Sequence, residues 1–131
     1  MNTRIAELLL EIKREFNKIK SLDEKVNMVN LINENIADIS PFNEPIGFVK
    51  WVKAEKVHAN EYNPNVVATP EMELLYTSIK SDGYTQPIVS YRCDNENYEI
   101  VDGFHRNRVG KEKKDIKEKL HGYLPLTMIN K

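Results

Sequence analysis

The segment from Tyr98 to Gly110 constrains the fold most strongly, because a short strand, a tight turn and a basic helix start follow one another directly. A partly buried strand is predicted up to Asp102. Gly103 lets the backbone turn sharply and approach a ligand without an intervening Cβ. The residues from 104 to 111 predict the first turns of a helix, so the segment predicts a strand-turn-helix unit.

The start of the predicted helix has the chemistry of an anion site. Unpaired backbone N–H groups and the positive end of the helix dipole favour a phosphate or a carboxylate there. His105, Arg106 and Arg108 add side-chain donors at the same place, and the guanidinium group is well shaped to bind phosphate oxygens in a bidentate manner. The alternative is an ordinary turn with solvated arginines and a histidine packed at the helix end.

Composition limits the class of protein. With 131 residues and 40% hydrophobic content, the chain is long enough for one compact domain with a core. A formal net charge of -1 gives no overall field toward DNA or an anionic membrane, so nucleic-acid binding would need a local patch. A single cysteine, Cys93, expected on a strand, excludes an intrachain disulfide. No segment resembles a signal peptide or membrane span, and we expect a cytoplasmic protein without membrane contact.

The first 40 residues predict a pair of helices. Apolar residues recur at spacings of three and four from Ile5 to Ile19, and the segment Ser21-Leu-Asp-Glu24 has the spacing of a capping box for a second helix. Pro41 ends that helix. We expect residues 1–40 to form an N-terminal helical segment that packs on the core, dimerises, serves as a bundle arm or covers the main domain.

Residues 48–131 predict short strands and helices in alternation. A strand or strand entry is expected around residues 48–52, a helix from Thr69-Pro70 to Asp82, and a hairpin of two strands that ends at Asp102. An exposed helix over residues 111–119 and a last strand over residues 124–129 complete the expected elements.

Three separated segments of this region resemble, in the same order, the ParB/sulfiredoxin-like domains. They are residues 55–65 with an Asn-Pro loop, residues 74–89 with a helix, a glycine turn and a Gln-Pro-Ile strand, and residues 103–109 with the sequence Gly-Phe-His-Arg-Asn-Arg-Val. The last falls where ParB proteins carry Gly-Glu-Arg-Arg and sulfiredoxin carries Gly-Cys-His-Arg. The similarity to IbrB-type proteins, described as co-activators of prophage gene expression, extends into residues 40–43.

The resemblance implies an α+β fold, a small mixed sheet with helices, preceded by the N-terminal helical pair. It also implies that the Gly103 turn binds a nucleotide: CTP in ParB, ATP in sulfiredoxin, and ADP or ATP in the free-serine kinases of this fold. The phosphate-binding positions that carry over are Gly103, Phe104, His105, Arg106 and Arg108, and the loop residues expected nearby are Asn60, Asn63 and Gln86.

The departures from the family patterns narrow the function. Phe104 stands where sulfiredoxin has its reactive cysteine and where ParB has an acidic residue, so sulfiredoxin chemistry is not expected. The chain ends before a helix-turn-helix or dimerisation domain, so chromosome partitioning is not expected either. The Asp-Gly-x-His-Arg form is closest to the serine kinases, which use a glutamate of the first-strand loop as a base, and Glu61 lies in the comparable loop.

Two hypotheses of different classes follow. In the first, the protein is an IbrB-like regulatory factor that binds a nucleotide or nucleic-acid phosphate and acts on gene expression, with a partner that resembles phosphoadenosine-phosphosulfate reductases and with contact to DNA. In the second, it is a small kinase or NTP hydrolase in which Asp102 and Glu61 hold Mg²⁺ or move a proton, and His105 with Arg106 stabilises the transferred phosphoryl group. Asp102 has a purely structural alternative, capping of the following helix.

Overall fold

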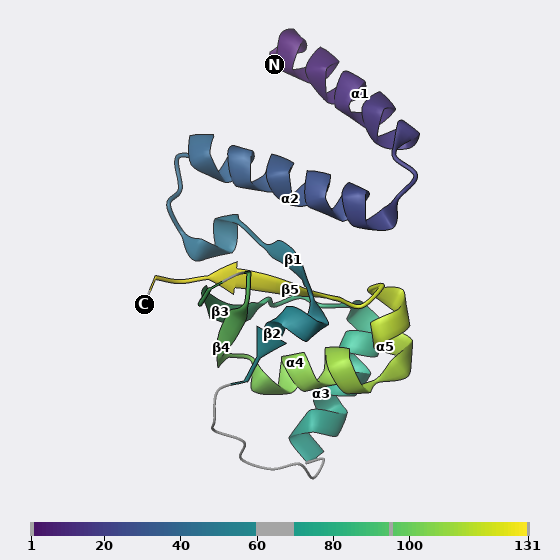
Figure 1. Ribbon diagram of the computed structural model, residues 1–131, viewed down its shortest axis with the longest axis vertical. Helices are drawn as coiled ribbons and strands as arrows, with labels where there is room; N and C mark the ends of the chain where they lie inside the picture. Colours follow the sequence, from purple (N-terminus) through teal and green to yellow (C-terminus); the bar gives the residue numbers. More distant parts are fainter. Residues whose placement is uncertain (1, 60–69, 95, 131) are drawn as a thin grey trace. The chain divides into compact units, whose positions relative to one another are not determined.

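The computed structural model describes residues 2–59, 70–94 and 96–130 of the chain. The chain divides into two compact units, Met1–Ile39 and Ser40–Lys131, which are described separately below (Figure 1). Among the described residues, none of the helices combines the length and the apolar character that crossing a membrane requires.

The first unit consists of two helices, α1 (Thr3–Lys18) and α2 (Leu22–Ile39), which diverge from a short connection (Figure 1). The side chain of Asn2 caps α1 by accepting a hydrogen bond from the backbone N–H of Ile5, at 3.1 Å. The predicted cap of the second helix is confirmed, because the Ser21 hydroxyl accepts from the backbone N–H of Glu24 at 3.2 Å.

The second unit is built on a five-stranded mixed sheet with the order β1-β5-β3-β4-β2. The strands are β1 (Lys50–Lys53), β2 (Val57–His58), β3 (Ile88–Arg92), β4 (Tyr98–Asp102) and β5 (Tyr123–Met128), with short 3₁₀ helices η1 (Pro45–Gly47) and η2 (Ala54–Lys56) before β1 and β2. The predicted hairpin is present as the antiparallel pair β3 and β4, while β5 runs parallel to β3 and antiparallel to β1. Cys93 is exposed and lies just after β3 rather than on a strand, so its expected position was wrong by one residue.

Three helices, α3 (Pro70–Asp82), α4 (Phe104–Glu112) and α5 (Lys114–Lys119), belong to the same unit. The prediction of one exposed helix over residues 111–119 was wrong, because Lys113 has an extended conformation, with φ −86° and ψ 111°, that separates α4 from α5. The change of direction lets α5 bury Ile116 in an apolar cluster with α3. One buried side chain therefore determines the path of a segment whose charges suggested full exposure.

The core consists of two apolar clusters. The first gathers side chains of the sheet: Val52, Val57, Ile88, Tyr98, Ile100, Leu124 and Leu126. The second gathers the helices around Met72, Ile79, Val109 and Ile116. Gly110 of α4 lies against both, since a Cβ built there would be 2.3 Å from Leu124 Cδ2 and 2.7 Å from the Tyr84 hydroxyl.

We expect Gly110→Val to lower the free energy of unfolding by about 2 to 3 kcal/mol, because the added atoms overlap a core leucine and a buried hydroxyl. Urea denaturation measures this difference. The matched control is Gly47→Val, where a Cβ meets no atom within 4 Å. Equal stabilities of the two variants would contradict the close packing of α4 on β5.

Candidate functional site

The turn between β4 and α4 places Gly103 at the N-cap position, directly before the first residue of the helix. Its backbone has φ 97° and ψ 33°, the left-handed conformation that glycine adopts without strain. The Gly103 carbonyl accepts the first helical hydrogen bond from the backbone N–H of Asn107, at 2.9 Å. The predicted strand-turn-helix unit is present, and no side chain among the described residues caps the start of its helix.

The Arg106 guanidinium folds back over this turn. A Cβ built on Gly103 would lie 3.0 Å from Arg106 Nη2 and 3.1 Å from Nε, so the glycine leaves the space that the guanidinium occupies. Arg106 Nη1 donates to Gln86 Oε1 at 3.2 Å. Arg106 Nε is buried and has no hydrogen-bond partner within the described part of the chain. The arginine is therefore held at the turn with donor capacity left over.

The Asp102 carboxylate borders the same turn and is largely exposed, with 76% of its side chain accessible. Its Oδ1 accepts from the backbone N–H of Gly103 at 2.9 Å, and its Oδ2 lies 3.9 Å from Arg106 Nη2. Because the cap position belongs to Gly103 and no side chain bonds the first helical turn, the capping alternative for Asp102 is not what the structure shows.

Tyr84 lies in the loop before β3, and its side chain is hydrogen-bonded to the backbone of α4. No pattern in the sequence identified this residue in advance. Its hydroxyl donates to the Arg106 carbonyl at 2.5 Å, and the backbone N–H of Gly110 is hydrogen-bonded to the same phenol. The phenol thus contacts two backbone groups of α4 that are four residues apart in the sequence. Tyr84 and Gln86 come from one loop, so this loop holds both the carbonyl and the guanidinium of Arg106.

We expect Tyr84→Phe to lower the free energy of unfolding by about 0.5 to 1.5 kcal/mol, the range for one lost hydrogen bond. Burial raises the pKa of Tyr84 from 10.0 to about 12, against the smaller lowering effects of the Gly110 N–H and of Arg106. A raised pKa favours the neutral phenol in the folded state, so its stabilisation is present below pH 10 and is lost as the pH rises toward about 12. Urea denaturation across this pH interval should show that the free energy of unfolding falls less steeply with pH in the variant than in the wild type.

The other predicted site residues lie in different surroundings. The Arg108 guanidinium binds the Glu112 carboxylate in a bidentate manner, with Nε 2.8 Å from Oε2 and Nη2 3.3 Å from Oε1. The hydrogen bond to Glu112 raises the pKa of Arg108. His105 is exposed, while Phe104 packs against the apolar cluster of the sheet. Asn60, Glu61 and Asn63 lie outside the described residues. The structure thus brings together Asp102, Gly103, Arg106 and Gln86.

Lys111 is a further basic residue of α4, and it is turned inward. Its ammonium group donates to the Val57 carbonyl at the start of β2. Burial of the ammonium group lowers the pKa of Lys111. This contact joins α4 to the edge strand next to β4, so Lys111 supports the site element rather than adding a free cation to the turn.

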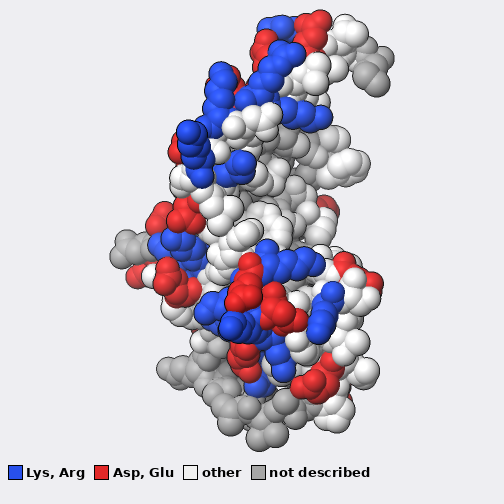
Figure 2. Space-filling model, turned by 90° about the vertical axis from the view of Figure 1, so that its right-hand side faces the viewer, with Lys and Arg blue, Asp and Glu red and all other residues white. Residues whose placement is uncertain are grey.

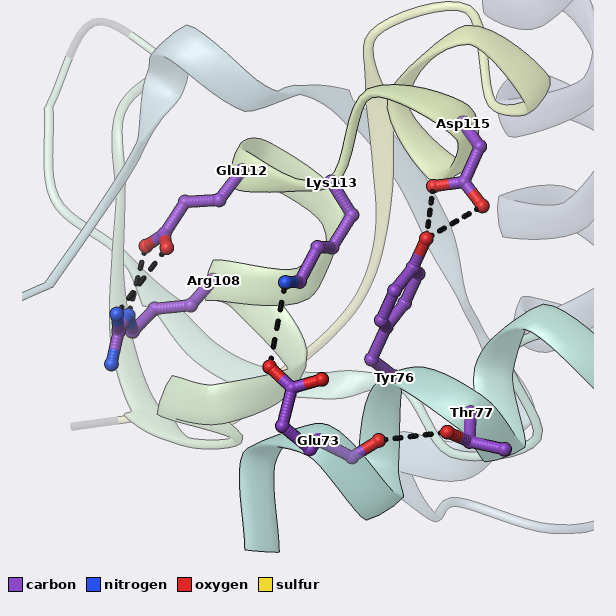
Figure 3. A network of polar contacts seen from close by, with 7 residues as sticks. All are labelled: Glu73, Tyr76, Thr77, Arg108, Glu112, Lys113 and Asp115. Atoms are coloured by element: carbon purple, nitrogen blue, oxygen red, sulfur yellow. Dashed lines mark hydrogen bonds and ion pairs between the residues drawn. The ribbon is translucent and has the colours of Figure 1, made fainter. Parts of the chain in front are cut away.

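The remaining charges of α4 and α5 are largely matched by carboxylates (Figure 3). Lys113 Nζ lies 3.7 Å from Glu73 Oε1 and 4.7 Å from the centre of the Tyr76 ring. The Tyr76 hydroxyl donates to both oxygens of Asp115 at 2.9 Å, and this bond raises the pKa of Tyr76. Figure 2, viewed from the side of α5, shows basic and acidic side chains interspersed on the second unit. The excess of basic residues after Asp102 therefore forms no continuous positive surface on this face.

The chain matches a model of the ParB N-terminal domain over residues 42–120. A curated relative, the uncharacterized protein YbdM of Escherichia coli (strain K12), is 47% identical over 108 residues, which are 82% of this chain and 52% of the relative. The chain thus spans about half the length of that relative.

Solved structures show the same fold at low identity. Sulfiredoxin from Arabidopsis thaliana superposes with a TM-score of 0.50 at 18% identity, covering 64% of this chain and 86% of sulfiredoxin. The C-terminally truncated SbnI from Staphylococcus aureus gives a TM-score of 0.51 at 22% identity and covers 69% of this chain and 34% of that protein. The predicted α+β fold with a small mixed sheet is confirmed, and the chain belongs to the ParB N-terminal domain family.

Proposed function

We propose that this protein binds a phosphate group of a nucleotide at the turn between β4 and α4 and uses the bound state in regulation. One observation carries the proposal: the Arg106 guanidinium lies over Gly103 at the start of α4, with its Nε buried and unpartnered among the described residues. A buried donor without a partner costs free energy, and a ligand oxygen would remove that cost.

The surroundings of Arg106 match a phosphate in chemistry. The positive end of α4 and a guanidinium group both favour an anion, and Gly103 leaves room for that guanidinium at the helix start. Within the described part of the chain, Arg106 Nη2 is paired only with Asp102, at 3.9 Å, and the pair is weak because the Asp102 carboxylate is largely exposed. Phosphate oxygens can replace this carboxylate at little cost.

The charge distribution favours a small ligand over a nucleic-acid duplex. Duplex binding draws its affinity from many unpaired cations along a surface. Here Arg108, Lys113 and Lys114 each have an acidic partner, at 2.8 Å, 3.7 Å and 3.9 Å respectively. Binding of a DNA duplex is therefore a competing outcome of the binding test.

The resemblance of residues 48–131 to IbrB-type co-activators supports a regulatory use of the nucleotide, beside a partner that resembles phosphoadenosine-phosphosulfate reductases.

Mg²⁺ fits the turn only together with ligand phosphates. Asp102 is the one carboxylate at the turn in the described region, and Mg²⁺ bound to nucleotides is typically held by one or two protein carboxylates. Asp102 would hold such an ion beside the phosphates.

The test is direct binding to the purified chain. Thermal shift and calorimetry with CTP, ATP, ADP, inorganic phosphate and a DNA duplex, each with and without Mg²⁺, should show stabilisation by at least one nucleotide. A ligand at 100 times its dissociation constant adds about 2.7 kcal/mol to the folded state. The control is Arg92→Ala, at the opposite end of the β3–β4 hairpin, which should bind equally well. Binding to the duplex alone, or no binding, would contradict the proposal.

A further inference from the structure

The Gln86 side chain contacts the guanidinium of Arg106 from the loop between α3 and β3. Its Oε1 accepts a hydrogen bond from Arg106 Nη1 at 3.2 Å. A guanidinium group only donates hydrogen bonds, so the carboxamide of Gln86 must turn its oxygen toward Nη1. The NH₂ group at the other end of the amide has no hydrogen-bond partner within the described part of the chain, and Gln86 is exposed. Two donors are therefore open to a ligand beside the guanidinium.

The backbone that carries Gln86 is held in place without a ligand. Pro87 follows directly and restricts the Gln86 backbone to extended conformations. Tyr84, two residues earlier, donates through its hydroxyl to the Arg106 carbonyl at 2.5 Å. On the other side of the bend, β3 begins at Ile88, whose side chain is buried in the apolar cluster of the sheet. The position of the amide relative to α4 is thus set by the packing of the loop.

The guanidinium of Arg106 has two neighbours of different chemistry. Gln86 faces Nη1 as a neutral amide, whereas the Asp102 carboxylate lies 3.9 Å from Nη2. A carboxylate repels a phosphate, while an amide NH₂ group donates hydrogen bonds to it. A phosphate is therefore favoured on the Gln86 side of the guanidinium, where donors of both residues are available.

We propose that Gln86 is a second phosphate-binding residue of this site, with its Oε1 orienting Arg106 and its NH₂ group donating to the same phosphate. The inference rests on the proposed function, because its ligand is the nucleotide phosphate that Arg106 binds. The base and the ribose take no part in this contact. Nucleotides that differ in the base should therefore depend on Gln86 to the same extent.

Gln86→Met tests this role, because methionine has a similar length and changes no charge but can neither orient Arg106 nor donate to a phosphate. Without Mg²⁺, the variant should raise the dissociation constants of CTP and ATP by about tenfold, the loss of one hydrogen bond to a charged group. Calorimetry measures both constants. The matched control is Thr85→Val, an exposed neighbour in the same loop, which should bind as the wild type does.

A double-mutant cycle with Arg106→Ala separates donation to the ligand from orientation of the arginine. If Gln86 itself donates to the phosphate, Gln86→Met should still weaken binding at least threefold when Arg106 is alanine. A loss that disappears in this background would show that Gln86 only orients Arg106, and this result would overturn the proposal.

The remaining outcomes distinguish this inference from the proposed function. Wild-type affinity of Gln86→Met for both nucleotides, with binding still lost in Arg106→Ala, overturns the role of Gln86 and leaves the phosphate site in place. A loss for CTP or ATP alone would place the amide at the base and would also overturn it. If the wild-type chain binds neither nucleotide, the role of Gln86 and the proposed function are both refuted.

Discussion

Arg106→Ala is expected to weaken the binding of CTP or ATP by about 10- to 100-fold, because a charge-assisted hydrogen bond contributes about 1.5 to 3 kcal/mol. The fold should survive the change, since Arg106 is not a member of either apolar cluster and its backbone carbonyl keeps the bond to Tyr84. Isothermal titration calorimetry gives the affinity, and thermal unfolding without ligand shows that the variant is folded.

Two further variants show whether the affinity depends on the charge of Arg106, on the planar shape of its guanidinium or on positive charge in general. Arg106→Lys keeps the charge but loses the planar fork, so its affinity should lie between those of the alanine variant and the wild type. Arg108→Ala should have a much smaller effect, because the Arg108 guanidinium is already bound to Glu112 at 2.8 Å. Equal losses for Arg106→Ala and Arg108→Ala would show general electrostatics rather than a site at the turn.

Gly103→Val should abolish the same binding through a different cause. Valine at φ 97° is strained, and its Cβ would be 3.0 Å from Arg106 Nη2, so the guanidinium must shift away from the turn. The free energy of unfolding should fall by about 1 to 2 kcal/mol as well. Calorimetry at a temperature where the variant is fully folded distinguishes lost binding from lost structure, and normal affinity would place the ligand elsewhere.

The sequence was sufficient where a local rule decides the structure. Ser21 predicted its helix cap, and the polar turn after β3 predicted the hairpin, because both depend on residues a few positions apart. Gly103 predicted the turn because few other residues adopt a positive φ. These features require no knowledge of tertiary contacts.

Tertiary contacts decided the rest. The break at Lys113 follows from burial of Ile116 against α3, which no local pattern of charges shows. The position of Tyr84 on the α4 backbone joins residues that are 22 positions apart. Arg108 was predicted at the turn because its residue type suits phosphate, yet a glutamate one helical turn further on binds its guanidinium. Sequence identifies the type of group available, and packing decides which group is free to act.

Asp102→Asn is expected to strengthen nucleotide binding about three- to fivefold in the absence of Mg²⁺. The exposed carboxylate adds a negative charge where the ligand phosphate is proposed to bind, and two unit charges about 4 Å apart in water repel by about 1 kcal/mol. Asparagine has the same shape and can still accept the bond from the Gly103 N–H. The variant therefore removes the charge and keeps the turn.

The same variant separates the regulatory proposal from the enzyme alternative. If Asp102 held Mg²⁺ or moved a proton in catalysis, Asp102→Asn would lower turnover by about 100-fold or more. Product analysis after incubation with ATP, ADP or CTP, Mg²⁺ and serine measures turnover. In a binding protein we expect no product from either form, and tighter binding by the variant in the absence of Mg²⁺. Phosphotransfer or hydrolysis that the Asp102 change abolishes would refute the regulatory proposal, because only a reacting site needs this carboxylate.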